Sequence, residues 1–439
     1  MKFYLAPLEG LTGYIYRNAM EKYFPGVDRY FTPFIAPDQN KILRTKEQRD
    51  VLPANNMVKN LVPQILTNNA EHFIRTTEAL QELGYEEVNL NLGCPSGTVV
   101  SRGRGSGFLA YPDELDRFLE QIFEGSRTKI SIKTRVGRDN ADDAFRLLEI
   151  YRKYPLSELI IHPRTRSEFY RGVPNLELFG EMAKWWEDSF ANEESEKESD
   201  GFTAVAEHKR NSAEAEQRIA GRNLLDQNKS GKPGITLCYN GNIMSTRDYQ
   251  TFTERFPNID CVMLGRGAIA NPGLIRQLKT GVPTDKKNLR AFHDEILEAQ
   301  REMVHEDKNA MFRMKEMWIY MIHLFGPTKA EIADYERIHG MRGDTILPGM
   351  PAAARPANYK EECDTCRSDS WIESEHFVKL EECGLERPLD RIESRTVEKC
   401  AKKIRKAQSL AEYKCVVDQL FAECELLDHG PKKWNLPQK

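Results

Sequence analysis

Short apolar runs recur along the first 264 residues, and each one ends in a polar or glycine-containing turn. There are eight, at residues 3–5, 30–34, 62–66, 88–92, 130–134, 159–162, 235–240 and 261–264. The stretches between them include residues 69–83, 112–123 and 142–154, whose apolar residues recur every three or four positions as in an amphipathic helix. Strands that alternate with helices pair in parallel, so eight such units predict an α/β fold, a closed (β/α)8 TIM barrel.

An open, doubly wound sheet is the alternative topology for the same alternation. Its dinucleotide-binding fingerprint would have to be Gly-Arg-Gly-Ser-Gly at residues 103–107. These glycines lack the GxGxxG spacing and follow the fourth predicted strand at a distance. We therefore prefer the barrel.

Residues 187–232 depart from this alternation. They stay polar after Trp185 and Trp186, and such a composition can bury little apolar area. We expect a mobile or partly helical surface insertion between the sixth and seventh strands of a barrel domain at residues 1–283.

The pattern becomes helical beyond Pro283. Strong helix formers with apolar residues at helical spacing occupy residues 288–305, 309–325 and 399–427. An irregular, proline-rich and cysteine-bearing stretch, about residues 328–395, lies between them. We predict that residues 284–439 form an all-helical bundle domain with this stretch as a second insertion.

The net charge of −4 is unevenly distributed. Residues 187–232 contain eleven acidic and seven basic residues, which accounts for the whole excess. Residues 399–406 contain no acidic residue and five basic ones, namely Lys399, Lys402, Lys403, Arg405 and Lys406. Such a run is most often a solvated helix face, but it also suits a phosphate backbone.

Other features of the composition indicate a cytoplasmic protein. The start of the chain has no secretory-signal pattern, and no run of eighteen apolar residues would span a membrane. Nine cysteines, an odd number spread unevenly, do not form a disulfide framework and suit a reducing compartment. No pattern points to an obligate protein partner.

Polar residues follow most of the predicted strands, at the end where barrels of parallel strands carry their chemistry. They are Gln64, Asn91 and Cys94, Lys133 and Arg135, His162 with Arg164 and Tyr170, Asn240 to Asn242, and Gly265 to Gly267. Cys94 lies in a tight Gly-Cys-Pro turn. A lone cysteine usually packs as a small hydrophobe, so it is the whole set that favours a functional thiol.

Two glycine loops follow the seventh and eighth strands, where such barrels commonly bind a phosphate through backbone N–H groups. Gly241, Gly265, Arg266 and Gly267 are placed for that role. Lys133 suits the stabilisation of negative charge, although a salt-bridged barrel lysine is an equal alternative. His162 is equally compatible with a core histidine, and no second histidine or carboxylate stands at ligand spacing, so no metal site is predicted.

The second insertion contains Cys363 and Cys366 at zinc-ligand spacing, followed by His376 and Cys383. Only one pair has that spacing, so zinc stays an alternative to be tested and the predicted set of metal ligands remains empty.

Six motifs resemble the tRNA-dihydrouridine synthase family in order and spacing. They are Ala6–Gly10, Asn91–Pro95, Lys133–Arg135, His162–Arg166 with Tyr170–Gly172, Asn240–Asn242 and Leu264–Ala268. The resemblance covers residues 3–327 apart from the first insertion, and resumes near Glu398 in Ile404–Tyr413. It implies an FMN-containing TIM barrel, NADPH or NADH as the reductant, and a helical C-terminal domain that helps to bind tRNA.

The resemblance also implies roles for individual residues. Cys94 would be the general acid, and the uracil would contact Asn91, Lys133, Arg135 and Tyr170. FMN would be held by Pro7, Gln64, Lys133, His162, Asn240, Asn242, Gly265 and Arg266, together with Gly241 of the first glycine loop. Two departures concern loop geometry: Pro163 stands where glycine is usual, and Gly97 where many members carry lysine.

The residue types fit that chemistry. Reduced FMN can deliver hydride to C6 of uracil, and a thiol with a pKa near 8.5 can donate the second hydrogen as a proton. The leading hypothesis is therefore an NAD(P)H-dependent flavoenzyme that reduces uridine in tRNA after taking it out of its stack.

Two other functions remain as alternatives. A flavin barrel acting on free pyrimidines or related enones would not need the helical domain with its basic run. A non-catalytic RNA-binding module would not need Cys94, Lys133 and His162 together.

Overall fold

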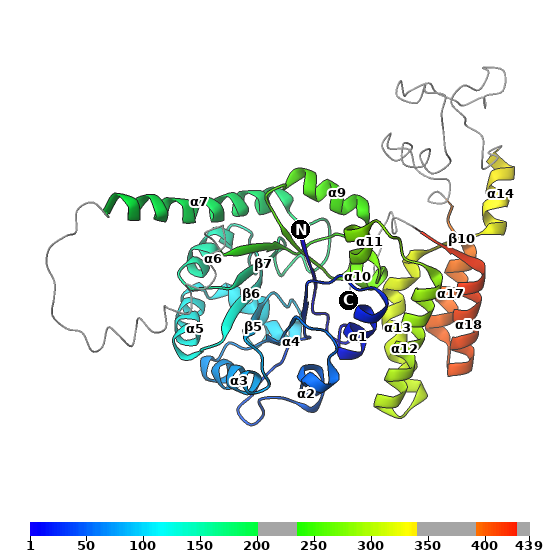
Figure 1. Ribbon diagram of the computed structural model, residues 1–439, viewed down its shortest axis with the longest axis horizontal. Helices are drawn as coiled ribbons and strands as arrows, with labels where there is room; N and C mark the ends of the chain where they lie inside the picture. The colour runs from blue at the N-terminus through cyan, green and yellow to red at the C-terminus, as the bar shows by residue number, and fades with distance from the viewer. Residues whose placement is uncertain (201–234, 340–391, 428–439) are drawn as a thin grey trace, which may run out of the picture.

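The computed structural model describes residues 1–200, 235–339 and 392–427. Its first part is a parallel barrel in which the eight predicted strands are confirmed (Figure 1). The strands are β1 (Lys2–Leu5), β2 (Arg29–Phe31), β3 (Leu61–Val62), β4 (Gln64–Ile65), β5 (Glu87–Leu92), β6 (Lys129–Arg135), β7 (Glu158–His162), β8 (Thr236–Tyr239) and β9 (Cys261–Leu264). They are hydrogen-bonded in the order β3-β2-β1-β9-β8-β7-β6-β5-β4.

Pro63 divides the third predicted strand into β3 and β4. Proline has no N–H to donate to a neighbouring strand, but its carbonyl still accepts a hydrogen bond from the Asn89 N–H at 2.8 Å. Since β3 pairs with β2 and β4 pairs with β5, the two ends of the sheet belong to one stretch of chain. The barrel therefore closes at this proline.

Both faces of the strands are buried, as expected for a parallel barrel. On β1, Phe3 and Leu5 pack outward against the helices, whereas Tyr4 belongs to a second cluster inside the barrel. The other members of that inner cluster are Ala6, Phe31, Val62, Ile160, Cys238, Cys261 and Met263. The period-two alternation of each strand thus fills the interior and the outer layer at once.

Helices surround the barrel. They are α1 (Tyr14–Tyr23), α2 (Thr45–Val51), α3 (Ala70–Glu82), α4 (Gly97–Val100), α5 (Pro112–Gly125), α6 (Asp143–Arg152), α7 (Leu176–Asp200), α9 (Thr246–Arg255), α10 (Arg266–Ala270) and α11 (Leu274–Thr280). The three helices predicted from apolar spacing are confirmed as α3, α5 and α6. Asn69 caps α3, since its side-chain oxygen accepts a hydrogen bond from the His72 N–H at 2.8 Å.

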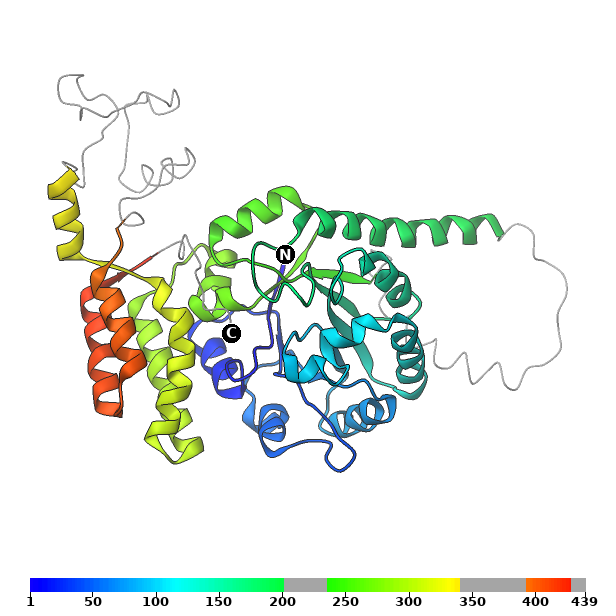
Figure 2. The same cartoon turned by 180° about the vertical axis from the view of Figure 1, so that it is seen from behind.

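The first predicted insertion begins inside a helix. Residues 187–200 continue α7, which extends beyond the barrel in Figure 2. Residues 201–234 lie outside the described residues, so the character of the insertion stays a prediction.

The C-terminal part is a bundle of α12 (Lys286–Val304), α13 (Asp307–Met321), α17 (Arg395–Lys406) and α18 (Leu410–Glu423), with α14 (Lys329–His339) beside it. It is not all helical. After the short turn Ile322–Leu324, the chain forms β10 (Phe325–Thr328), which pairs antiparallel with β11 (Cys424–Leu426). The predicted helix therefore ends early, at Met321, and Gly326 and Pro327 lie in the strand β10 that follows.

Helix α14 occupies the start of the stretch that we expected to be irregular. Residues 340–391, which include Cys363, Cys366, His376 and Cys383, lie outside the described residues. No described helix is both long enough and apolar enough to cross a membrane.

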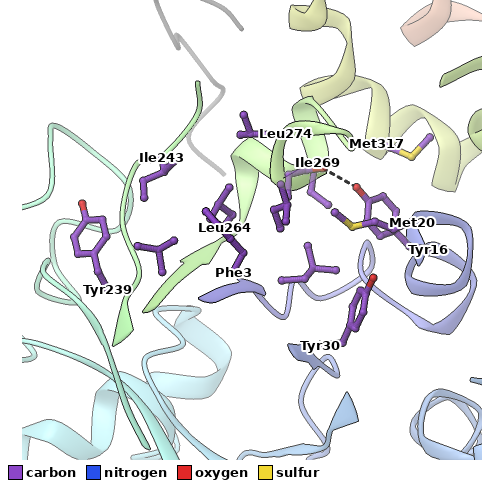
Figure 3. Packing of buried hydrophobic residues seen from close by; sticks show 14 of the residues in the cluster. Phe3, Tyr16, Met20, Tyr30, Tyr239, Ile243, Leu264, Ile269, Leu274 and Met317 are labelled. Carbon is purple, nitrogen blue, oxygen red and sulfur yellow. Dashed lines mark hydrogen bonds between the residues drawn. The ribbon is translucent and has the colours of Figure 1, made fainter. Parts of the chain in front are cut away.

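The bundle packs against the barrel through α1 and α10. The Tyr16 and Phe292 rings meet edge to face with centroids 5.4 Å apart, and the Tyr16 hydroxyl donates to the Ala268 carbonyl at 2.9 Å. Figure 3 shows Met317 of α13 beside Met20 and Ile269 in the same cluster. Because one apolar core continues through both parts, the division of the chain after residue 283 stays a prediction.

Candidate active site

A buried row of amide side chains orders the barrel interior below the Cys94 turn. The Gln64 Nε2 donates to Asn89 Oδ1 at 2.8 Å, and the Asn91 Nδ2 donates to Gln64 Oε1 at 2.7 Å. The Asn89 Nδ2 in turn donates to the Ser131 hydroxyl at 3.0 Å. These bonds determine which way each amide points. The Asn91 Oδ1 is therefore directed at the turn that follows β5.

Asn91 holds that turn in place. Its Oδ1 accepts hydrogen bonds from the N–H groups of Gly93 at 3.1 Å and Cys94 at 2.9 Å. On the other side, the Ser106 hydroxyl and N–H both donate to the Cys94 carbonyl, at 2.7 and 3.1 Å. The Cys94 side chain is only partly buried. The thiol thus has a defined position and stays accessible.

The environment of Cys94 favours the protonated form of its thiol. Burial raises the pKa of the thiol, and this effect outweighs the Ser96 N–H and the cations Arg135 and Lys133, which stabilise the thiolate. The side chain is therefore a neutral thiol at pH 7. It is a proton donor in its resting state rather than a ready nucleophile.

Arg135 links two loops through hydrogen bonds. Its Nε donates to the Gly93 carbonyl at 2.8 Å, and its Nη1 donates to the carbonyls of Thr165 and Phe169, both at 2.8 Å. These bonds fasten the Cys94 turn to the loop after β7. The structure therefore shows a positioning role for this predicted substrate-binding residue, whose contact with a substrate remains a prediction.

Lys133 lies two residues before Arg135 on β6 and points to the same side of the strand. In the part of the chain that the structure describes, its ammonium makes no hydrogen bond and no ion pair. Burial, with a contribution from the Arg135 charge, lowers its pKa to about 8. A half-buried cation without a counter-ion can receive an anionic group.

His162 is neutral, and its contact with Arg164 shows which ring nitrogen carries the proton. Burial and the charges of Arg135, Lys133, Arg164 and Arg266 hold the pKa of His162 well below its usual range. The Arg164 Nη1 lies 2.9 Å from His162 Nε2. A guanidinium can only donate, so Nε2 accepts and the ring proton is on Nδ1.

Arg164, which the sequence placed after the strand of His162 without indicating a role for it, belongs to the site. Its side chain is fully buried, and it donates to the carbonyls of Arg171 at 3.1 Å and Gly172 at 2.7 Å. It also reaches Asn242 Oδ1 at 3.4 Å. Arg164 thus orients His162 and links the loops after β7 and β8. An arginine directly beyond a buried strand end was the available signal.

The glycine loops after β8 and β9 lie against each other. A Cβ added at Gly267 would stand 2.2 Å from the Ile243 carbonyl oxygen, so only glycine permits this approach. The Asn240 Nδ2 donates to the Met263 carbonyl at 2.8 Å, and Arg266 Nη2 donates to Asn242 Oδ1 at 2.7 Å. The first N–H groups of α10 begin beside Arg266. Together these groups form a cationic cradle suited to an anion.

Tyr170 lies between the two sides of the site. Its ring is 5.3 Å from the Arg135 guanidinium and 5.0 Å from that of Arg266, and it is 38% exposed. It also lies 6.0 Å from the His162 ring. A second aromatic residue, Tyr320 of α13, interacts electrostatically with Arg266 and Tyr170. The sequence carried no signal for Tyr320, because the bundle brings it to the site.

The predicted site residues therefore meet at one end of the barrel. Contacts join Gln64, Asn91 and Cys94 on one side, and His162, Tyr170, Asn242 and Arg266 on the other. Pro7 follows Ala6, whose Cβ would be 3.4 Å from a Cβ added at Gly265, so it borders the glycine loops. Gly241 is equally confined, since an added Cβ would lie 1.9 Å from the Tyr239 hydroxyl.

The fold and this site define a class of protein: a TIM barrel with two closely packed glycine loops and an arginine after its last two strands and a protonated thiol after β5. The sequence matches the family described as "Dihydrouridine synthase (Dus)" over residues 4–178 and 195–338. The chain belongs to this family, as the motifs predicted. It is accordingly an oxidoreductase that acts on a CH–CH bond.

Relatives similar in sequence agree with this assignment. The chain is 28% identical over 271 residues to "Probable tRNA-dihydrouridine synthase 2" of Bacillus subtilis, covering 62% of this chain and 70% of that protein. It is 22% identical over 285 residues to "tRNA-dihydrouridine synthase B" of Pasteurella multocida, covering 65% and 70%. A solved structure of morphinone reductase with tetrahydroNAD has a TM-score of 0.37 and 12% identity, covering 65% of this chain and 88% of that one.

Proposed function

We propose that the protein is a tRNA-dihydrouridine synthase, which uses bound FMN and NADPH or NADH to reduce the C5=C6 bond of uridines in tRNA. The observation that carries this proposal is the pairing of a protonated thiol, Cys94, with Lys133, a cation that has no partner among residues 1–200, 235–339 and 392–427, opposite the anion cradle. Reduction of a polarised double bond needs a proton donor and a positive charge to stabilise the electron-rich intermediate.

The site has the groups that FMN would require. Gly241, Gly265, Asn242 and Arg266 would hold the phosphate, because close loop packing brings N–H groups and a guanidinium together there. Lys133 and His162, an ammonium and an imidazole with a proton on Nδ1, offer two donors to the ring. Pro7, Gln64 and Asn240 would complete the FMN site.

The residues of this chain would complete the reduction. When bound and reduced, FMN supplies the hydride that adds to C6 of uracil. The resulting negative charge spreads over C5 and O4, where the Lys133 ammonium would stabilise it. Cys94 would then donate its proton to C5, which completes the addition of two hydrogens. Asn91, Arg135 and Tyr170 would contact the base, which must leave its stack to enter the site.

The surface of α17 favours tRNA over a free pyrimidine or enone. Cys400 and Ile404 are buried on one face of this helix, whereas Lys399, Lys402, Lys403, Arg405 and Lys406 are all exposed. Only Lys402 lies near a carboxylate, Glu398 at 3.7 Å, among the described residues. A basic helix face suits a phosphate backbone, and a small substrate has no use for it.

We further propose a cytoplasmic location. All six cysteines of the described residues are free thiols, which suits a reducing compartment. The proposal does not include an obligate protein partner.

Replacing Cys94 by alanine tests the mechanism. The variant should retain bound flavin, and NADPH should still reduce it, because neither step uses the thiol. Oxidation of the reduced enzyme by unmodified tRNA should slow by a factor of about 10² to 10⁴. Single-turnover absorbance at the flavin band, with flavin content measured in parallel, gives both quantities.

Cys415→Ala is the matched control, since Cys415 is an exposed thiol of α18. It should behave as the wild type. An unchanged rate in Cys94→Ala would mean that another group supplies the proton. A wild-type protein that binds no FMN, or whose reduced flavin is not oxidised by tRNA, would contradict the proposed function itself.

A further inference from the structure

Arginines gather on the barrel rim next to the Cys94 turn, and the proposed chemistry does not use them. Arg102 and Arg104 lie on the loop between α4 and the turn of Gly105–Ala110, and Arg44 precedes α2. We call these three residues the rim arginines. Burial, followed by the charges of Arg102 and Arg44, lowers the pKa of Arg104. Arg102 and Arg104 are two residues apart on one loop, whose Arg102 carbonyl is held by Asn68 of the loop after β4. Arg102 and Arg44 are exposed.

The nearby carboxylates are already engaged. Asp38 Oδ1 accepts from the N–H groups of Asn40 and Lys41 at 3.0 and 2.9 Å, and Oδ2 lies 3.4 Å from Arg44. The Glu47 carboxylate accepts from the N–H groups of Ala36 and Arg44. Within the described ranges, the guanidinium groups of Arg102 and Arg104 form no hydrogen bond and no ion pair.

Such an arrangement has a cost in the unbound protein. Arg44 has Asp38 as a counter-ion, but one carboxylate does not balance three guanidinium groups. The excess positive charge is repulsive, even though water and salt weaken the repulsion. A polyanion would reverse the sign of this interaction. Guanidinium groups are suited to that partner, because their planar fork matches two oxygens of a phosphate.

The loop that carries Arg102 and Arg104 is tied to the thiol. Ser106 donates two hydrogen bonds to the Cys94 carbonyl. A Cβ added at Gly105 would stand 2.9 Å from that carbonyl and 3.1 Å from Cys94 Cβ, and Gly105 has φ +56°. Asn68 Nδ2 holds the Arg102 carbonyl at 3.2 Å. An anion bound by these arginines would therefore be held at a constant offset from Cys94.

We propose that Arg102 and Arg104, assisted by Arg44, bind phosphates of the nucleotides that flank the uridine reduced at Cys94. This inference rests on the proposed function. The anion cradle at Arg266 lies beyond β8 and β9, whereas the rim arginines lie beyond β2 and β5, so the two cationic groups belong to different loops of the barrel. One would serve the cofactor and the other the RNA backbone, which has to be gripped beside a base that leaves its stack.

The test compares three variants by their affinity for unmodified tRNA at several salt concentrations. They are the double variant Arg102→Ala with Arg104→Ala, the double Arg→Lys variant at the same positions, and Arg127→Ala. Arg127 is exposed and precedes β6, so it lies at the opposite end of the barrel. Flavin content and melting temperature check that each variant is folded.

We expect the double alanine variant to bind tRNA on the order of tenfold more weakly at physiological salt. The slope of log Kd against log salt concentration should fall by roughly 0.7 to 0.9 for each phosphate that the variant no longer binds. KM should rise more than kcat falls. The lysine variant should recover the salt slope but only part of the affinity, because lysine lacks the bidentate fork.

A double alanine variant that matches Arg127→Ala in Kd and salt slope would overturn this inference alone, provided that tRNA oxidises the reduced wild-type flavin. Failure of the wild type to react with tRNA would instead remove the proposed function, and this inference with it. The two failures are therefore distinguishable in one set of measurements.

Discussion

Burial shifts the pKa of ionisable groups at both ends of the barrel: it lowers the pKa of His162 at one end and raises that of Glu158 at the other. His162, at the site, is held neutral because burial and four cations disfavour its charged form. Glu158 begins the same strand at the other end and is also buried. Burial raises its pKa to about 7, although Arg29 lies 3.4 Å away and the Tyr4 hydroxyl donates to it at 2.7 Å.

Glu158 should make the protein less stable as pH rises. Its pKa is higher in the folded state than the 4.5 of an unperturbed glutamate, so the folded state binds more protons between pH 4.5 and 7. The carboxyl group therefore contributes stability below pH 4.5, and this contribution is lost as pH rises through 7. Glu158→Gln cannot ionise, and should exceed the wild type by up to about 3 kcal/mol at pH 8.

Urea unfolding at pH 5 and pH 8 measures this effect. The variant and the wild type should differ little at pH 5 and clearly at pH 8. Glu149→Gln, at an exposed position of α6, should show no such change. An equal difference at both pH values for Glu158→Gln would contradict an elevated pKa.

The short helix α10 is placed by contact rather than by its own stability. It has five residues, too few to persist alone. Gly267 lets it approach the loop after β8, and the bond from Arg266 to Asn242 joins the two segments. The anion cradle therefore exists only while both loops keep this spacing.

Gly267→Ala should damage the cradle selectively. The added Cβ would meet the Ile243 carbonyl at 2.2 Å and Met244 Cα at 3.1 Å, so backbone atoms must move. Overpacking of this kind costs about 1–3 kcal/mol of folding stability, which the two loops can relieve by moving apart. Because the cradle needs both loops, we expect a titration to show FMN binding weakened by roughly tenfold or more. Gly97→Ala, where an added Cβ meets nothing within 4 Å, should bind FMN normally. Equal affinities for the two variants would show that the loops tolerate separation.

The bundle is held together by a buried hydrogen-bonded group that joins three of its helices. Trp318 Nε1 of α13 donates to the Tyr413 hydroxyl of α18 at 2.6 Å, and that hydroxyl lies 2.7 Å from His293 Nε2 of α12. Burial lowers the pKa of His293, so its ring is neutral. With His293 Nδ1 directed at Asp294 at 2.8 Å, Nε2 accepts the Tyr413 proton.

Tyr413→Phe should destabilise the whole molecule, because the barrel and the bundle share one apolar core. The substitution leaves a buried indole N–H and an imidazole nitrogen without partners, at a cost of about 1–3 kcal/mol. Calorimetry or denaturant unfolding should show that decrease. Tyr111→Phe, at a 47% exposed position, should change stability by less than about 0.5 kcal/mol. A Tyr413→Phe protein as stable as this control would mean that water replaces the hydroxyl.

The sequence by itself determined the barrel and the residues at its active end. Strand periodicity, glycine and proline turns and helix caps are local properties. All eight strands and the family motifs could therefore be recognised in the sequence alone. The order of strands then placed Cys94, Lys133, His162 and Arg266 at one end, because parallel strands share a direction.

Only the tertiary structure decided what those residues contact. Arg135 bonds to carbonyls 30 and 34 residues away, and Tyr320 reaches the site from a different part of the fold. The pair β10 and β11 forms between segments about 100 residues apart. Hydrogen-bond partners, burial and pKa shifts depend on groups that are distant in the chain, so no local pattern encodes them. The rim arginines come from two loops, after β2 and after β5, so only the closed barrel lets their charges act on one another.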